Sequence, residues 1–404
     1  MKLEFPKGFL WGSATSSHQV EGGNFNDWTE WEKKNADKLV RKAKTFWHGR
    51  QKKKFPEMFE SKNYISDKAC DHYNRYEQDF DIVKELGHNA HRFSIEWSRI
   101  EPEEGKFNEG AIRHYKNVVS ALRARGIEPF VTLYHWTMPV WFAKKGGWLN
   151  KDAYKYFERY VNKVVSQLSK LNSNSCVNFW VTINEPQIYS FNSFLKGVRP
   201  PQMKNPFRYY KVLKNLVLAH KKAYRVIKKI NPGAQVGIGK NNIYFEYTSF
   251  VDYFWNRWFL NKIKKYQDFI GLQYYFHSCL FGNKSESVTD MGWEIYPKGI
   301  YHVLKELKRY KKPIYITENG LADADDSRRE KFIKEHLQWV HKSIEGGVDV
   351  RGYFYWSLLD NFEWDKGYWP RFGLVEVNFE TQERKIRPSA YKYAEICKNN
   401  TLDF

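Results

Sequence analysis

Eight short apolar runs recur along the chain, and they constrain its fold more than any other feature of the sequence. They are rich in β-branched and aromatic residues and are almost continuously apolar, which is typical of parallel strands buried on both faces. The runs are residues 9–15, 90–97, 129–135, 178–185, 235–241, 269–275, 313–319 and 352–360.

Amphipathic, helix-like stretches lie between these runs, and three of them (71–87, 108–126 and 332–347) end at a glycine that can cap a helix. Eight strands that alternate with helices predict an α/β fold, specifically a (β/α)8 TIM barrel. No Gly-, Ser- or Pro-rich linker divides the chain, so we expect residues 1–404 to form a single domain. The alternative is a doubly wound open sheet, but no G-x-G-x-x-G turn or P-loop follows any run.

The fifth βα unit is abbreviated, because only residues 243–268 separate the fifth run from the sixth. We expect one short helix there, roughly from Thr248 to Lys264, with part of its aromatic surface exposed. The apolar positions with helical spacing are Phe250, Val251, Phe254, Trp255, Trp258, Phe259 and Ile263.

The formal net charge of +20 is typical of proteins that bind nucleic acid or an anionic surface. However, the Lys and Arg residues are spread over separated, helix-like segments, which favours solvated faces and makes a nucleic-acid partner unexpected. The four cysteines form no CxxC pair, and no apolar run is long enough for a signal peptide or a membrane span. We therefore expect a cytoplasmic protein that does not contact a membrane.

Polar side chains follow several of the runs, at the end of a barrel strand where such barrels carry their chemistry. Glu185 ends the fourth run in TINEP, and Glu318 ends the seventh in ITENG. Strands four and seven lie nearly across a barrel, so the two carboxyl groups can face each other over its mouth. The other polar or aromatic residues within the strands, at their ends or in the loops just beyond are Gln19, Arg92, Glu96, His135, Trp136, Asn184, Tyr274, Tyr275, Trp356, Glu363 and Trp364.

Two opposed carboxyl groups surrounded by tryptophan and polar side chains are what the hydrolysis of a glycosidic bond requires. One must donate a proton to the leaving oxygen and the other must be ionised, so their pKa values must differ. Arg92 near Glu318 would keep that carboxylate charged, and a less polar setting would hold the proton on Glu185. We expect no metal and no other cofactor, since the sequence contains neither HExxH nor G-x-S-x-G.

Six segments resemble family 1 glycoside hydrolases, the β-glucosidase and β-galactosidase type, and together they cover nearly the whole chain. They are FLWGSATSSHQVEG (9–22), HRFSIEWSRIEP (91–102), VTLYHWTMPVWF (131–142), VTINEP (181–186), YITENG (315–320) and WSLLDNFEWDKGYWPRFGLV (356–375).

The resemblance implies a retaining mechanism in which Glu185 is the acid/base and Glu318 the nucleophile. It also implies that Trp356 forms the platform under the sugar ring and that Trp293 lies at the aglycone site. Arg92 and Tyr275 would flank the nucleophile. The hydroxyl groups of the non-reducing sugar would be held by Gln19, His135, Trp136, Asn184, Glu363 and Trp364.

Two features depart from the family pattern or remain open. Gln273 stands where the family usually has asparagine, which moves the side-chain amide by one methylene. The basic stretch 33–69 either forms part of the cleft rim or is an unrelated surface excursion.

We expect hydrolysis of small-molecule β-glucosides or short oligosaccharides, and of β-galactosides or β-fucosides, with the oligomeric state left open. One alternative is a 6-phospho-β-glycosidase, which the positive charge favours but Glu363 opposes, because its carboxylate would repel a 6-phosphate. The other is a catalytically silent barrel that binds carbohydrate or nucleic acid.

Overall fold

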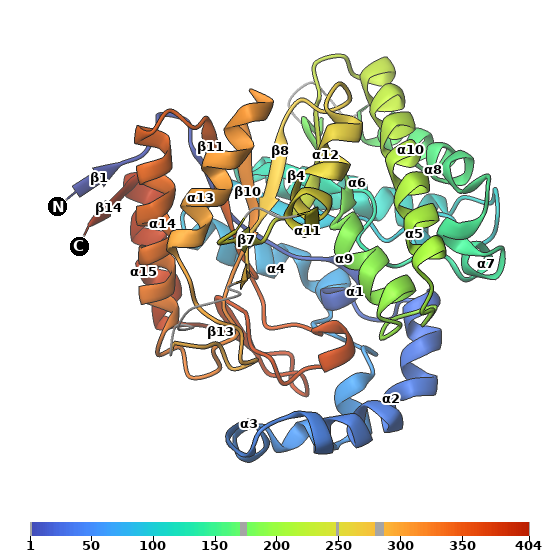
Figure 1. Cartoon of the computed structure of the whole chain (residues 1–404), viewed down its shortest axis with the longest axis horizontal. Coiled ribbons are helices and arrows are strands. Elements are labelled where there is room, and N and C mark those ends of the chain that lie inside the picture. The colour runs from blue at the N-terminus through green and yellow to red at the C-terminus, as the bar shows by residue number, and fades with distance from the viewer. Residues whose placement is uncertain (1, 170–175, 248–249, 279–286, 404) are drawn as a thin grey trace.

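The eight apolar runs form eight parallel strands that close into a barrel, as predicted (Figure 1). The computed structural model describes residues 2–169, 176–247, 250–278 and 287–403. Neighbouring strands follow one another around the barrel in chain order, and the last pairs with the first. The strands are β2 (Leu10–Ala14), β3 (Ala90–Ser94), β4 (Glu128–Thr132), β5 (Phe179–Asn184), β6 (Gln235–Asn241), β8 (Ile270–Gln273), β10 (Ile314–Asn319) and β11 (Val350–Trp356).

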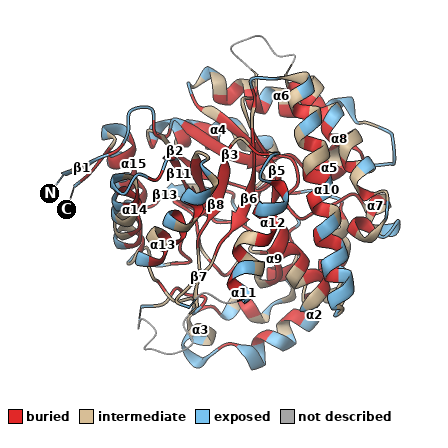
Figure 2. Cartoon of the chain, turned by 45° about the horizontal axis from the view of Figure 1, so that its top comes forward, coloured by how far each residue is buried: buried red, intermediate tan, exposed pale blue. Residues whose placement is uncertain are grey.

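Helices surround the barrel and present their buried stripes to it, with their exposed faces outward (Figure 2). The three helices expected from glycine-capped stretches are present, and Gly87 and Gly126 follow two of them with left-handed φ angles of 68° and 73°. The longer helices are α4 (His72–Glu85), α6 (Glu109–Ala124), α8 (Ala153–Leu168), α10 (Pro206–Ile230), α13 (Lys298–Leu307), α14 (Arg329–Glu345) and α15 (Pro388–Asn399).

Shorter elements complete the chain. The first and last strands, β1 (Lys2–Glu4) and β14 (Thr401–Asp403), pair with each other and bring the ends of the described chain together. The remaining short elements are α1 (Ser17–Val20), α5 (Trp97–Ile100), α7 (Val140–Lys144), α9 (Pro186–Ser190), β7 (Tyr244–Phe245), β9 (His277–Ser278), β12 (Val375–Val377) and β13 (Arg384–Ile386).

Aromatic rings close the amino-terminal end of the barrel. Phe130 on β4 stacks on Phe179 at the start of β5, with ring centroids 4.4 Å apart. Phe269, Tyr315 and Phe354 pack around the same phenylalanine at centroid distances of 4.9–5.5 Å. Offset and edge-on packing of this kind stabilises the core beyond simple burial. The interior is therefore filled at this end, which leaves the carboxyl ends of the strands for polar chemistry.

The fifth unit holds one short helical segment, and its aromatic surface is partly exposed, as predicted. Residues 248–249 lie outside the described chain, so the predicted start at Thr248 is not described. Phe250 is 80% exposed, whereas Phe259 is fully buried against the barrel. A π-helical turn interrupts the segment, which consists of α11 (Phe250–Asp252), η5 (Tyr253–Arg257) and α12 (Trp258–Ile263).

The basic amino-terminal stretch forms two helices, α2 (Asp27–Phe46) and α3 (Gly49–Lys54), that run along the lower edge of Figure 1. The Asn26 side chain accepts hydrogen bonds from the first-turn N–H groups of Trp28 and Thr29, and this cap begins α2. The stretch carries part of the cavity wall described below, so it belongs to the cleft rim.

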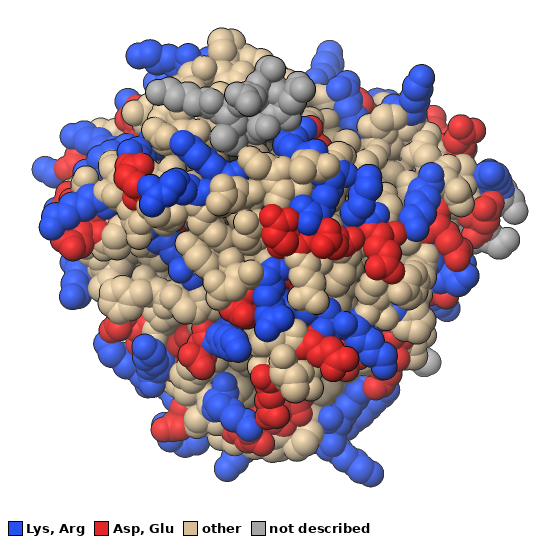
Figure 3. Space-filling model, turned by 180° about the vertical axis from the view of Figure 1, so that it is seen from behind, with Lys and Arg blue, Asp and Glu red and all other residues tan. Residues whose placement is uncertain are grey.

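Lysine and arginine side chains are scattered over the face shown in Figure 3 and are interspersed with acidic ones. This arrangement is that of solvated helical faces, as expected from the sequence. Within the described ranges, no helix combines the length and the apolar character needed to cross a membrane.

Candidate active site

A cavity of about 620 Å³ opens at the carboxyl ends of the barrel strands. All the residues that the sequence analysis placed in contact with the sugar or aglycone line it, although they come from segments spread over most of the chain. They are Gln19, His135, Trp136, Asn184, Glu185, Tyr275, Trp293, Glu318, Trp356, Glu363 and Trp364. Arg92, on β3, does not line the cavity but contacts two of these residues.

Glu318, on β10, is buried and accepts hydrogen bonds from three side chains. Arg92 Nη1 lies 2.5 Å and Gln273 Nε2 lies 2.6 Å from Oε1, and the Tyr275 hydroxyl lies 3.1 Å from Oε2. Burial raises the pKa of the Glu318 carboxyl above its ordinary value, and the Arg92 charge and the hydrogen bonds from Arg92 and Tyr275 offset only part of this rise. Three donors directed at one carboxyl group favour its ionised form.

Glu185 directly follows β5 and adopts a left-handed backbone conformation, with φ of 44°. Its N–H donates to the Gly239 carbonyl of the neighbouring strand at 2.7 Å, and Pro186 then begins α9. A left-handed non-glycine residue costs about 1–2 kcal/mol, and such strain clusters at functional sites. Burial, and next the charge of Glu318, raise the pKa of the Glu185 carboxyl to about 8, against a weaker hydrogen bond from Asn241.

A hydrogen-bond network joins the two glutamates to the neighbouring strands. Asn184 Oδ1 accepts from Arg92 Nη2 at 2.6 Å and from Gln273 Nε2 at 2.7 Å. The longer side chain of Gln273 therefore reaches both Asn184 and Glu318, which explains how this departure from the family pattern is accommodated.

The His135 ring also contacts Asn184. Asn184 Nδ2 lies 3.0 Å from His135 Nε2 and donates to it, so the proton of the neutral ring is on His135 Nδ1. Among the described residues His135 Nδ1 is buried and has no hydrogen-bond partner.

Two tryptophans on the cavity wall also have left-handed backbone conformations, Trp136 with φ of 75° and Trp364 with φ of 51°. Their rings pack against each other at a centroid distance of 4.7 Å. The Trp136 indole N–H donates to the Asn184 carbonyl at 3.2 Å, so Trp136 presents its ring to the cavity and not its N–H.

Glu363 is a third glutamate of the cavity wall. Its carboxyl accepts a hydrogen bond from Gln19 Nε2 at 3.3 Å, and burial raises the pKa of this carboxyl to about 7.

Two other strand-end residues do not reach the cavity. The Glu96 carboxylate accepts hydrogen bonds from the hydroxyl groups of Ser17, Ser98 and Thr137, and its role is to fasten three loops together. The Tyr274 hydroxyl donates to the Tyr296 carbonyl. A polar residue at a strand end is therefore not sufficient to define the site.

Several residues of the cavity wall were not predicted from the sequence. Asn241 ends β6 and bonds to Glu185, so the rule applied to the other strand ends would have found it. The wall residues on α2 and on the loops carried no comparable signal. They include Lys42, Phe46, Trp47, Ile188, Asn192, Lys196, Val198, Arg199, Phe276, Asp365, Lys366 and Phe372.

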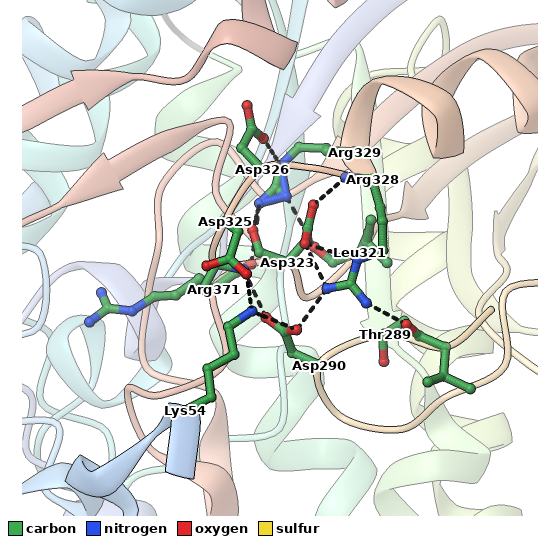
Figure 4. Close-up of polar contacts among 12 residues, drawn as sticks. Lys54, Thr289, Asp290, Leu321, Asp323, Asp325, Asp326, Arg328, Arg329 and Arg371 are labelled. Carbon is green, nitrogen blue, oxygen red and sulfur yellow. Dashed lines mark hydrogen bonds and ion pairs between the residues drawn. The ribbon is translucent and has the colours of Figure 1, made fainter. Parts of the chain in front are cut away.

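A cluster of ion pairs fastens α3 to two loops of the cleft (Figure 4). Lys54 Nζ lies 3.1 Å from Asp290 and 2.5 Å from Asp325. Arg328 joins the same Asp290 to Asp323, at 2.7 Å and 2.6 Å. Two loops are thus tied to the rim: the loop before α13, which includes Trp293, and the loop that follows the Glu318 strand β10.

Within the described residues, no group of three or more His, Cys, Asp or Glu side chains is placed to hold a metal ion. Two carboxyl groups at strand ends, those of Glu185 and Glu318, line the same cavity.

With two carboxyl groups over the mouth of its barrel, the protein has the arrangement of a (β/α)8 glycoside hydrolase. The model of glycosyl hydrolase family 1 matches residues 1–249 and 258–402, and the chain belongs to this family. The unmatched residues 250–257 coincide with α11 and η5, in the abbreviated fifth unit.

Similar proteins agree with this assignment. β-Glucosidase A of Thermotoga maritima is 35% identical over 468 residues, covering 99% of both chains. A β-glycosidase from Pyrococcus horikoshii is 42% identical with a TM-score of 0.86, over 100% of this chain and 97% of that one. The family 1 β-glucosidase from Thermotoga maritima in complex with isofagomine lactam is 32% identical with a TM-score of 0.86, over 98% and 99% of the two chains.

Proposed function

We propose that this single barrel domain is a retaining β-glycosidase that releases terminal, non-reducing β-D-glucosyl residues, and also β-D-galactosyl or β-D-fucosyl residues. One observation carries the proposal: two buried glutamates in one cavity differ in the donors and charges that surround them. Glu318 accepts hydrogen bonds from three donors, one of them a guanidinium, whereas the pKa of Glu185 is raised to about 8. A nucleophile needs the first environment and a general acid needs the second.

In the first step the Glu318 carboxylate attacks the anomeric carbon and the bond from that carbon to the leaving oxygen breaks. Glu185 donates its proton to this oxygen, so the aglycone leaves as a neutral alcohol. In the second step water attacks the same carbon, Glu185 takes up the proton of the water, and the bond to Glu318 breaks. Two inversions give a sugar with the original β configuration.

The sugar ring would lie against Trp356, which lines the cavity. His135 Nδ1 would donate to one hydroxyl, and the second hydrogen of Asn184 Nδ2 would bind the 2-hydroxyl beside the anomeric carbon. A bond to the 2-hydroxyl strengthens as charge develops on the ring. Gln19 and Glu363, which bond to each other, would hold hydroxyls at the far end of the sugar.

The proposal is tested with a panel of nitrophenyl β-glycosides and with the product configuration. We expect turnover of the β-glucoside and β-anomeric glucose as the first product in proton NMR spectra taken before mutarotation. α-Glucose as the first product would indicate inversion and exclude Glu318 as a nucleophile. Carbohydrate binding with no turnover of any glycoside would indicate a silent barrel instead.

The pH dependence of kcat/KM should be bell-shaped. Activity should rise as Glu318 ionises and should fall above about pH 8, where Glu185 loses the proton that the leaving group needs. The two carboxyl groups interact, so both limbs report the pair. In Glu185→Gln the alkaline limb should disappear when a dinitrophenyl glycoside is the substrate, and a limb that persisted would assign it to another group.

The 6-phospho-β-glycosidase alternative is disfavoured by Glu363. Its carboxyl group lines the cavity beside Gln19, where the far end of the sugar would lie. An ionised carboxyl group at this point would repel a 6-phosphate, which carries one to two negative charges near pH 7.

A further inference from the structure

The cavity has two buried glutamates at the strand ends, Glu185 and Glu318, and four cations on its wall that are more exposed. One is on α2, two follow η4 (Phe191–Leu195), and one is on η7 (Trp364–Lys366). These cations are Lys42, Lys196, Arg199 and Lys366.

Two of the four cations have a carboxylate partner and two do not. Arg199 Nε lies 3.0 Å and Lys366 Nζ lies 2.6 Å from the Asp365 carboxylate, so these two share one negative charge. The Arg199 guanidinium also lies 4.6 Å from the centre of the Trp136 ring, which fixes it against the wall. Lys42 and Lys196 are exposed, and no carboxylate of the described chain lies within ion-pair distance of either.

These lysines are close enough to repel one another. Partial burial lowers the pKa of the Lys42 ammonium, and the nearby charges of Lys366 and Lys196 lower it further against the attraction of Asp365. Lysines on a solvated face normally spread apart, but here three segments distant in sequence bring their ammonium groups to one wall. A bound anion would relieve this repulsion and gain attraction from each cation.

We propose that Lys42, Lys196 and Lys366 form a subsite at the cleft mouth that binds an anionic group on the aglycone of a β-glycoside. The subsite rests on the proposed function, because the rest of the substrate must occupy the sugar site below. Phe46 and Trp47 line the cavity beside Lys42, so a planar aromatic aglycone with a carboxylate, sulfate or phosphate has both an apolar surface and cations to contact.

An anion on the aglycone is favoured over one on the sugar, because Glu363 would lie at the far end of the proposed sugar site. The burial-raised pKa of its carboxyl, about 7, leaves this group part ionised at neutral pH. An anionic substituent on the sugar would meet this charge, whereas an anion on the aglycone would meet Lys42 and Lys196, which are the exposed cations of the wall.

The test uses two substrates that differ by one charge, 3-carboxyumbelliferyl β-D-glucoside and its neutral carboxamide. We compare the ratio of their kcat/KM values in wild type, in Lys42→Gln/Lys196→Gln, and in Lys44→Gln. The last variant removes one charge from α2 at a position that does not line the cavity. Because the ratio compares two substrates on one enzyme, a general loss of activity cancels.

Loss of two cations should lower the carboxylate-to-carboxamide ratio about tenfold, while Lys44→Gln should leave it unchanged. Raising the salt concentration from about 0.05 M to about 0.5 M should move the wild-type ratio toward that of the double variant. A ratio equal in wild type and double variant would overturn the subsite. Lysine-dependent turnover of glucose-6-phosphate glycosides, without a carboxylate preference, would place the anion on the sugar and overturn the aglycone assignment.

Binding of the two glucosides to the Glu318→Gln variant tests the subsite independently of turnover, and therefore independently of the proposed function. Calorimetry on this variant gives Kd for both intact substrates, with and without the two lysine substitutions. Tighter binding of the carboxylate than of the carboxamide, lost with the two lysines, supports the subsite even if wild type hydrolyses neither substrate. Absence of hydrolysis in that case would contradict the proposed function but not the subsite. Equal Kd values for the two substrates would overturn the subsite.

Discussion

Glu318→Gln should abolish turnover of every glycoside, whereas Glu185→Gln should retain measurable turnover of dinitrophenyl glycosides. The reason is that loss of a nucleophile prevents the first bond from forming, whatever the leaving group. A dinitrophenolate leaves without a proton, so this substrate does not need the general acid, whose contribution is about 10²–10⁴-fold. Steady-state rates on a dinitrophenyl and an alkyl glucoside, measured for both variants, test the expectation.

Azide gives the same assignment an independent readout. With Glu185→Ala, azide should attack the glycosyl-enzyme and yield the β-glycosyl azide. With Glu318→Ala, it should attack the substrate directly from the opposite face and yield the α-glycosyl azide. An α-glycosyl azide from Glu185→Ala and a β-glycosyl azide from Glu318→Ala would mean that Glu185 is the nucleophile and Glu318 the acid/base.

Glu96→Gln is the matched control for both glutamate variants, because Glu96 also stands at a strand end but lies outside the cavity. Its three hydroxyl contacts predict a loss of thermal stability. Folded enzyme should keep its turnover and its pH profile.

Arg92→Gln should lower kcat/KM about 10²–10³-fold at neutral pH and should also destabilise the fold. Arg92 is fully buried, and its guanidinium bonds to Glu318, Asn184 and Thr132. Breaking a buried ion pair from one side costs about 3–5 kcal/mol, because the other charge is left without its partner. Glu318 can avoid that cost by taking up a proton, so the acidic limb of the pH profile should move to higher pH.

Arg123→Gln provides the comparison for Arg92. Arg123 pairs with Glu128 at the start of β4, at the opposite end of the barrel from the cavity. This variant should lose some stability in chemical denaturation while its acidic limb stays in place. If Arg92→Gln also left the acidic limb unmoved, Arg92 would be a structural residue and not the group that keeps Glu318 ionised.

Local sequence patterns were enough to predict the barrel and much of its site. The eight apolar runs became the eight strands, because runs of this composition are stable only where both faces are covered. Once the strands are known, the residue that ends each one is known, and barrel geometry directs those residues to one mouth. Glu185, Glu318 and Asn184 were found in this way, and Asn241 could have been.

The resemblance to a family supplied what the strand pattern could not, which is the role expected for each residue. The strand-end pattern alone did not distinguish Glu96 from the two cavity glutamates. That distinction depends on Ser98 and on two hydroxyl groups from other loops, Ser17 and Thr137, and the positions of these loops follow from packing between distant segments.

The sequence by itself determined the secondary structure, the barrel and the residues at its strand ends, because these depend on periodicity and on one repeated geometry. Only the tertiary structure decided that α2 forms the cleft rim, or that Lys42, Lys196 and Lys366 meet on one wall. The reason is physical: a strand-end residue is placed by its own strand, whereas a loop residue is placed by contacts with parts of the chain hundreds of residues away. In the sequence these lysines belong to scattered basic segments, and folding alone makes them neighbours.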